Sequence, residues 1–80
     1  MTPIEQENRL EEARKLADLI ENRSLKARTL SENWSSLENK ICDYIGYLEN
    51  LKYREVDSKL LDYLGSYVTD EYERLTKFED

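Results

Sequence analysis

Apolar residues recur along this chain in steps of three and four, the spacing that places side chains on one face of an α-helix. The pattern is clearest in the middle of the chain, at Leu30, Trp34, Leu37, Ile41, Tyr44, Ile45, Leu48 and Leu51. A thinner pattern precedes it at Leu10, Ala13, Leu16, Ala17 and Ile20, and another follows at Leu61, Leu64, Val68, Leu75 and Phe78. We therefore predict an all-α protein with three helices, roughly 3–23, 30–53 and 57–78, in a single domain spanning residues 1–80.

Capping residues support these helix starts. Thr2 is followed by a proline and, three positions later, by Glu5, an arrangement typical of a capping box with proline in the first turn. Thr29 and Glu32 form a second candidate capping box, and Asp57 can cap the third helix. Each helix thus has a plausible N-terminal signal.

The breaks between the helices are less strongly marked, since neither contains glycine or proline. Weak helix formers at 22–24 predict a break somewhere in residues 22–30, and a second break is predicted near 54–58. The alternative is a continuous helix whose apolar repeat shifts at the first of these places.

The second and third predicted helices have wider apolar faces than one neighbouring helix would cover. At about 100° per residue, the apolar arc of the third helix spans roughly 180°, whereas a surface helix typically shows about 100° or a little more. The first helix offers only a narrow, alanine-rich face. We expect that three such helices do not close around a core of their own. The predicted fold is a three-helix bundle or helical hairpin that associates as a homodimeric helical bundle or coiled coil. The alternative is a self-contained three-helix bundle.

A seven-residue motif occurs twice, as KICDYIG at 40–46 and KLLDYLG at 59–65. In both copies we expect the tyrosine and the next aliphatic residue to face inward, and the aspartate and glycine to face outward. A glycine inside a helix costs roughly 0.5–1 kcal/mol relative to alanine, so an outward glycine favours a site where a partner approaches the backbone. The alternatives are a slight helix bend and chance similarity.

All six tyrosines lie at or after position 44. Tyrosine has an apolar body and a polar tip, and it is favoured in the hot spots of protein interfaces. The tyrosines therefore indicate a partner-binding C-terminal half, unless they only close the edge of the core. The candidate partner-binding residues are Leu60, Tyr63, Leu64, Tyr67 and Tyr72, followed by Tyr44, Gly46 and Tyr47.

Composition argues against an enzyme. The chain has no histidine and one cysteine, which excludes an internal disulfide, an ordinary Cys/His zinc site and the usual general base. Cys42 lies at the margin of the middle apolar stripe and is predicted to be a small structural hydrophobe. Neither glycine belongs to a phosphate-binding loop pattern. We predict no catalytic residue, no metal and no cofactor.

Charge is unevenly distributed in this acidic chain. The formal net charge is −6, and residues 55–80 hold eight acids but only three bases. Arg23, Lys26 and Arg28 form a small basic segment, which is too little for direct binding of nucleic acid by an acidic protein. Acid-first pairs four residues apart, which stabilise helices, are Glu5–Arg9, Glu11–Lys15, Glu55–Lys59, Asp70–Arg74 and Glu73–Lys77.

The expected location is the cytoplasm. No run of 18 apolar residues predicts a membrane span, and the acidic charge argues against binding to anionic membranes. The first residues lack a signal-peptide pattern, and a lone free cysteine agrees with a reducing compartment.

These features together favour a small non-enzymatic protein-interaction protein. We expect a regulator, inhibitor or assembly chaperone that docks amphipathic helices on a protein partner. One alternative is an acidic mimic of nucleic acid that blocks a DNA- or RNA-binding protein. Another is a structural coiled-coil spacer, which requires helices that continue through both predicted breaks.

Overall fold

A computed structural model of the chain describes residues 2–50 and 58–79. These residues form helices α1 (Pro3–Lys26), α2 (Ser31–Glu49) and α3 (Ser58–Glu79), and no strand occurs among them. The predicted all-α fold with three helices is confirmed. The predicted end of the second helix at 51–53 and the Asp57 cap lie outside the described residues.

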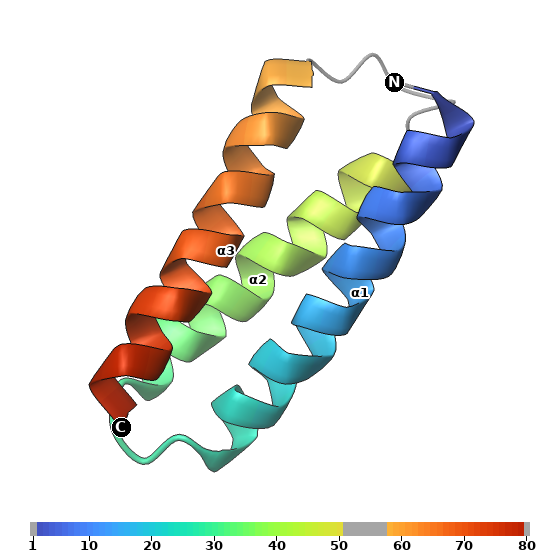
Figure 1. Cartoon of the computed structure of the whole chain (residues 1–80). Helices are drawn as coiled ribbons and strands as arrows, with labels where there is room; N and C mark the ends of the chain where they lie inside the picture. The colour runs from blue at the N-terminus through green and yellow to red at the C-terminus, as the bar shows by residue number, and fades with distance from the viewer. Residues whose placement is uncertain (1, 51–57, 80) are drawn as a thin grey trace.

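In the view of Figure 1 the helices run down, up and down, so α2 is antiparallel to both of its neighbours. The bundle measures 39 × 19 × 17 Å along its principal axes. Helices α1 and α3 each pack mainly on α2 and make little contact with one another. Packing on α2 therefore holds the other two helices in place.

The start of α1 follows its sequence closely. The Thr2 hydroxyl accepts a hydrogen bond from the backbone N–H of Glu5 at 3.2 Å, and proline occupies the first turn. This bond satisfies one of the N–H groups that the first turn of any helix leaves without a partner. Thr2 is thus the cap that the sequence predicts.

The start of α2 differs from the prediction. The chain breaks after α1, within the predicted interval, but α2 begins at Ser31 and its cap position is Leu30. Leu30 has φ 60° and ψ 20°, in the left-handed region, and no side chain caps the helix. The predicted Thr29 cap is therefore absent. The half-buried Leu30 side chain packs against the core instead, so tertiary packing holds this residue where local capping does not.

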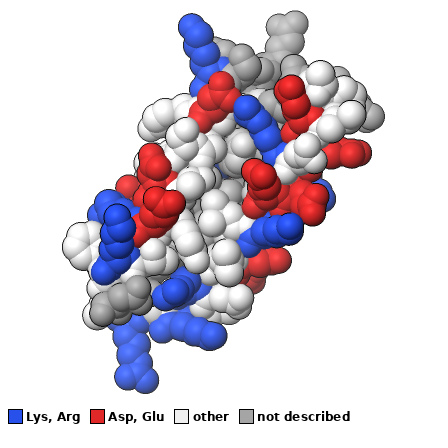
Figure 2. Space-filling view, viewed as in Figure 1, with Lys and Arg blue, Asp and Glu red and all other residues white. Residues whose placement is uncertain are grey.

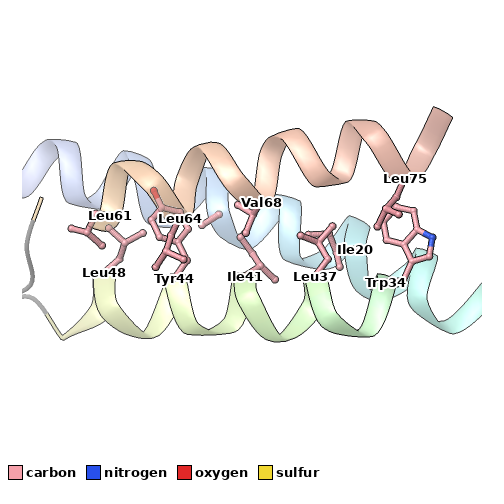
Figure 3. Packing of buried hydrophobic residues seen from close by; sticks show 11 residues of the cluster. Ile20, Trp34, Leu37, Ile41, Tyr44, Leu48, Leu61, Leu64, Val68 and Leu75 are labelled. Atoms are coloured by element: carbon pink, nitrogen blue, oxygen red, sulfur yellow. The ribbon is translucent and has the colours of Figure 1, made fainter. Parts of the chain in front are cut away.

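The helices enclose one hydrophobic core within a single chain (Figure 3). Helix α1 contributes Ala13 and Ile20, α2 contributes Trp34, Leu37, Ile41, Tyr44 and Leu48, and α3 contributes Leu61, Leu64, Val68 and Leu75. Leu48 lies opposite Leu61 at one end of the core, and Trp34 lies opposite Leu75 at the other. The expectation that the helices would not close around a core of their own is wrong, because only the centre of each broad apolar arc needs to be buried.

Trp34 fills the end of the core that lies near the start of α2. Its side chain is fully buried, and its ring meets Tyr72 edge to face at a centroid distance of 5.9 Å. Its indole N–H has no hydrogen-bond partner among the described residues. Phe78, which the apolar spacing assigns to the same face of α3, is instead 68% exposed.

Surface ion pairs follow the helix pattern only in part. Pairs among the described residues include Lys15–Glu11 at 3.4 Å, Arg74–Glu71 at 2.6 Å, Arg9–Asp62 at 2.8 Å and Arg14–Glu49 at 3.1 Å. The predicted Glu11–Lys15 pair is confirmed. Arg9 pairs with another helix rather than with Glu5, and Arg74 pairs with Glu71 rather than with Asp70. Because the groups are partly or largely exposed, water screens their charges and each pair contributes little to stability.

None of the helices in the described part of the chain combines the length and the apolar character that crossing a bilayer requires.

Candidate protein-binding surfaces

A groove of about 500 Å³ lies between α1 and α3, and side chains of α2 form its base. Its floor includes Ile41 and Tyr44 of α2, and its walls include Ala13 of α1 and Val68 of α3. All four of these side chains are buried by their neighbours. The groove therefore exposes little apolar surface.

A polar contact crosses this groove and joins α1 to α3 beside Tyr44 of α2. The Arg9 guanidinium of α1 donates a hydrogen bond to Asp62 of α3 at 2.8 Å. This bond raises the pKa of Arg9, and the nearby hydroxyl of Tyr44 from α2 adds to the effect. A Cβ added at Gly65 of α3 would lie 3.1 Å from that hydroxyl oxygen. Gly65 therefore provides the space in which the Tyr44 side chain lies.

The two copies of the repeated motif face different surroundings. Helix α2 buries the second and fifth residues of its copy, Ile41 and Tyr44, and then Leu48. Helix α3 buries the third and sixth residues of its copy, Leu61 and Leu64, and then Val68. Relative to the shared motif, the buried set is displaced by one residue, or about 100° around the helix axis. Tyr63 is consequently 62% exposed, and the prediction that it faces inward is wrong.

The glycines of the motif diverge for the same reason. Gly65 faces Tyr44, so the prediction that it faces outward is wrong, and the group that approaches its backbone belongs to the same chain. A Cβ at Gly46 would meet nothing within 4 Å, so this glycine does face open space as predicted.

Three of the eight candidate partner-binding residues form one exposed edge of α3. Leu60 is 40% exposed and Tyr63 is 62% exposed, and Tyr67 follows one turn later, half-buried against the core. The rings of Tyr63 and Tyr67 lie 6.1 Å apart between centroids and are tilted by 31°. We call Leu60, Tyr63 and Tyr67 the tyrosine stripe.

The other five candidates do not join this stripe. Tyr44 and Leu64 belong to the buried core, which leaves their side chains out of reach of a partner. Tyr47 and Tyr72 are half-buried against the core, and Tyr72 lies beside Trp34 rather than beside Tyr63. Gly46 offers open backbone but no side chain.

A second exposed surface, which the sequence did not predict, lies at the end of the molecule where α1 and α3 terminate. A hollow of about 600 Å³ there is lined by Leu19, Asn22, Arg23, Lys26, Ala27, Arg28, Thr29, Tyr72 and Phe78. We call this surface the basic end. Figure 2 shows Lys and Arg side chains gathered at the corresponding lower end of the view. The sequence alone could flag the basic segment, but it could not bring this segment to Phe78, which lies about fifty positions further along the chain.

Few groups on the described surface suggest bond-making chemistry. No cluster of three or more His, Cys, Asp or Glu residues that could hold a metal ion occurs in residues 2–50 and 58–79. Cys42 is exposed, so the prediction that it is a small structural hydrophobe is wrong.

Comparisons with known proteins gave no match to a family model, to a curated protein or to a solved structure.

Proposed function

We propose that this protein is a non-enzymatic protein-interaction protein, a regulator, inhibitor or assembly chaperone, that docks on a partner through the tyrosine stripe of α3. The observation that carries the proposal is that the bundle completes its core without Leu60 and Tyr63. Leu60 and Tyr63 remain in solvent on one edge of a helix, next to Tyr67.

The spacing of the stripe suits docking of one helix on a protein surface. Its residues stand at i, i+3 and i+7, the pattern with which an amphipathic helix enters an apolar groove. Tyrosine side chains lose little conformational entropy on binding and keep a polar hydroxyl for the rim of the interface. The partner would present an apolar groove or the apolar face of another helix.

A second copy of the chain is one such partner, and the homodimer remains part of this proposal. A two-fold axis beside the stripe would bring the α3 helices of both copies together, with each tyrosine pair contacting the other. Such an interface needs no change in the core of either copy.

The two alternative functions have weaker support. A nucleic-acid mimic needs a continuous row of carboxylates, but on α3 Asp62 is paired with Arg9 and Glu71 with Arg74. A coiled-coil spacer needs continuous helices, whereas the chain leaves the helical conformation at 27–30. We therefore retain the protein-docking function.

Site-specific cross-linking tests the proposal. A photoreactive amino acid is placed at Tyr63, and a control protein carries it at Asn39, an exposed position on α2. In an extract of the source organism, we expect a discrete cross-linked product from position 63 and none from position 39. The same product should fall at least about tenfold when Leu60→Ser is added, because hot-spot side chains contribute about 1–2 kcal/mol or more.

The identity of the cross-linked product separates the two kinds of partner. A product of twice the chain mass identifies a second copy, whereas any other discrete mass identifies a different protein. Equal, diffuse cross-linking from positions 63 and 39 would contradict a binding role for the stripe.

A further inference from the structure

The basic end combines residues from three parts of the chain. The last two turns of α1 supply Leu19, Arg23 and Lys26, the segment after the helix supplies Arg28, and α3 supplies Tyr72 and Phe78. Figure 1 shows the C-terminal ends of α1 and α3 at the same end of the bundle. The hollow between them is therefore a property of the fold and not of a single segment.

Positive charge at this end contrasts with the rest of the molecule. Residues 22–29 contain three cations and no acid in a chain of net charge −6, and among the residues whose side chains the structure describes no acid lines the hollow. Arg23 and Lys26 lie in the last turn of α1, where cations also stabilise the helix dipole. Arg28 lies beyond the end of the helix, so the dipole does not account for it.

Exposed apolar side chains accompany these cations. Leu19 is 49% exposed and Phe78 is 68% exposed, and both line the hollow. Leu25, in the last turns of α1, is 79% exposed. A ligand that neutralised the cations alone would leave these apolar groups in water.

We propose that the basic end binds an acidic segment of a protein partner, in which carboxylates flank one aromatic or large aliphatic side chain. The carboxylates would contact Lys26 and Arg28, and the apolar side chain would enter the hollow against Leu19 and Phe78. The inference rests on the proposed protein-binding function but not on the tyrosine stripe, since the two surfaces share no residue.

Charge distribution favours a peptide over nucleic acid at this surface. A nucleic-acid strand carries one negative charge on every nucleotide and would be repelled by the acidic remainder of the molecule. A short peptide concentrates a few carboxylates against the basic end, and its apolar side chain gains contacts with Leu19 as well as with Phe78. Complementary charges would also speed its association.

Binding of synthetic peptides measures this preference. The first probe is a short fluorescent peptide with glutamates on both sides of a central phenylalanine. In the second probe alanine replaces the phenylalanine, and in the third glutamine replaces every glutamate. By fluorescence anisotropy we expect the first probe to bind, with affinity that falls as salt rises, and each of the others to bind at least about tenfold more weakly.

Variants of the chain locate the binding. Lys26→Glu combined with Arg28→Glu should weaken binding of the first probe by about a hundredfold, and Phe78→Ser by about tenfold. The control combines Lys15→Glu with Lys40→Glu, two exposed lysines elsewhere on the bundle, and makes the same change in net charge. All of these side chains are exposed, and circular dichroism verifies that each variant is folded.

Several results would overturn the inference. These are no binding of the first probe at about 1 mM, equal loss in the control variant, or tighter binding of a single-stranded oligonucleotide of the same length. Self-association that disappears in the Lys26→Glu/Arg28→Glu variant would assign the surface to a second copy instead.

The two proposals fail separately. Leu60→Ser/Tyr63→Ser should leave binding of the first probe unchanged, and the basic-end variant should leave cross-linking from position 63 unchanged. Cross-linking without peptide binding rejects only the basic end, and peptide binding without cross-linking rejects only the stripe.

Discussion

The two glycines show that the same added methyl group can have opposite effects at equivalent positions of a repeated motif. At Gly46 an added methyl group would enter open space, whereas at Gly65 it would lie 3.1 Å from the hydroxyl oxygen of Tyr44. The sequence presents the two residues as equivalent, and only the packing of α2 against α3 distinguishes them.

We expect Gly46→Ala to raise the free energy of unfolding by about 0.5–1 kcal/mol, because alanine favours the helix and nothing obstructs it. Gly65→Ala should be less favourable than Gly46→Ala by about 1 kcal/mol, because Tyr44 must move to make room. The measurement is urea denaturation followed by circular dichroism.

A control removes the obstructing atom. In a Tyr44→Phe background the hydroxyl is gone, and the nearest atom to the added methyl group lies at 3.4 Å, an ordinary van der Waals distance. Gly65→Ala should then recover most of the stability that alanine gains over glycine inside a helix. Equal effects of Gly65→Ala in both backgrounds would show that Tyr44 does not restrict this site.

A carboxylate on α3 gives a pH-dependent prediction. Two hydrogen bonds from Arg74, at 3.0 and 2.6 Å, lower the pKa of Glu71 in the folded protein. A lowered folded pKa means that the pair stabilises the fold above the ordinary glutamate pKa of about 4.3, and that this contribution is lost as pH falls through the folded value. In Arg74→Gln, an NMR titration should show the Glu71 pKa returning upward. An unchanged pKa would mean that the pair does not persist in solution.

The buried residues of α2 could be predicted from spacing because this helix has a neighbour on either side. Every position in the series from Trp34 to Leu48 that steps by three and four is buried or half-buried. On α3 the same reasoning assigned Tyr63 and Phe78 to the core, and both are largely exposed. Helix α3 packs mainly on α2 alone, so the edges of its wide apolar arc remain in solvent.

The conformation of the connection between α1 and α2 could not be predicted from the sequence. No glycine marks the turn, and the left-handed residue is Leu30, whose side chain packs on the core. Local propensity disfavours that conformation for leucine by roughly 1–2 kcal/mol. The position is fixed by the way α1 and α2 meet, which spacing along the chain does not reveal.

This conformation makes a glycine preferable to an alanine at position 30. Both Leu30→Gly and Leu30→Ala should lower stability, because each removes a half-buried side chain. We expect the glycine variant to be the more stable of the two by about 1 kcal/mol, since glycine accepts a positive φ. At Asn39, inside α2, the same comparison should favour alanine by a similar amount. Thermal unfolding compares the four variants, and an alanine advantage at both positions would contradict the left-handed conformation.

At the scale of the whole molecule, the core explains why the predicted dimer is not needed to bury the apolar faces. Apart from Ile4 and Leu25, the large apolar side chains that remain exposed lie at the tyrosine stripe and at the basic end, two surfaces that the sequence did not separate. The homodimer is therefore predicted to form through the tyrosine stripe alone.

We expect sedimentation to show a concentration-dependent mass that approaches twice the 9.6 kDa of one chain. Leu60→Ser/Tyr63→Ser should shift the protein to the monomer, and Lys15→Glu/Lys40→Glu should not. A mass of one chain at every concentration would contradict the homodimer while leaving other partners of the stripe untouched.

The central position of α2 has a consequence for how the protein reaches its fold. Because α1 and α3 pack mainly on the helix that lies between them in the sequence, most contacts join segments that are close along the chain. Chains of this kind form native contacts without first closing large loops, and they fold within microseconds to milliseconds. Trp34, the single tryptophan, is buried against α3 and should report this rapid collapse directly by its fluorescence.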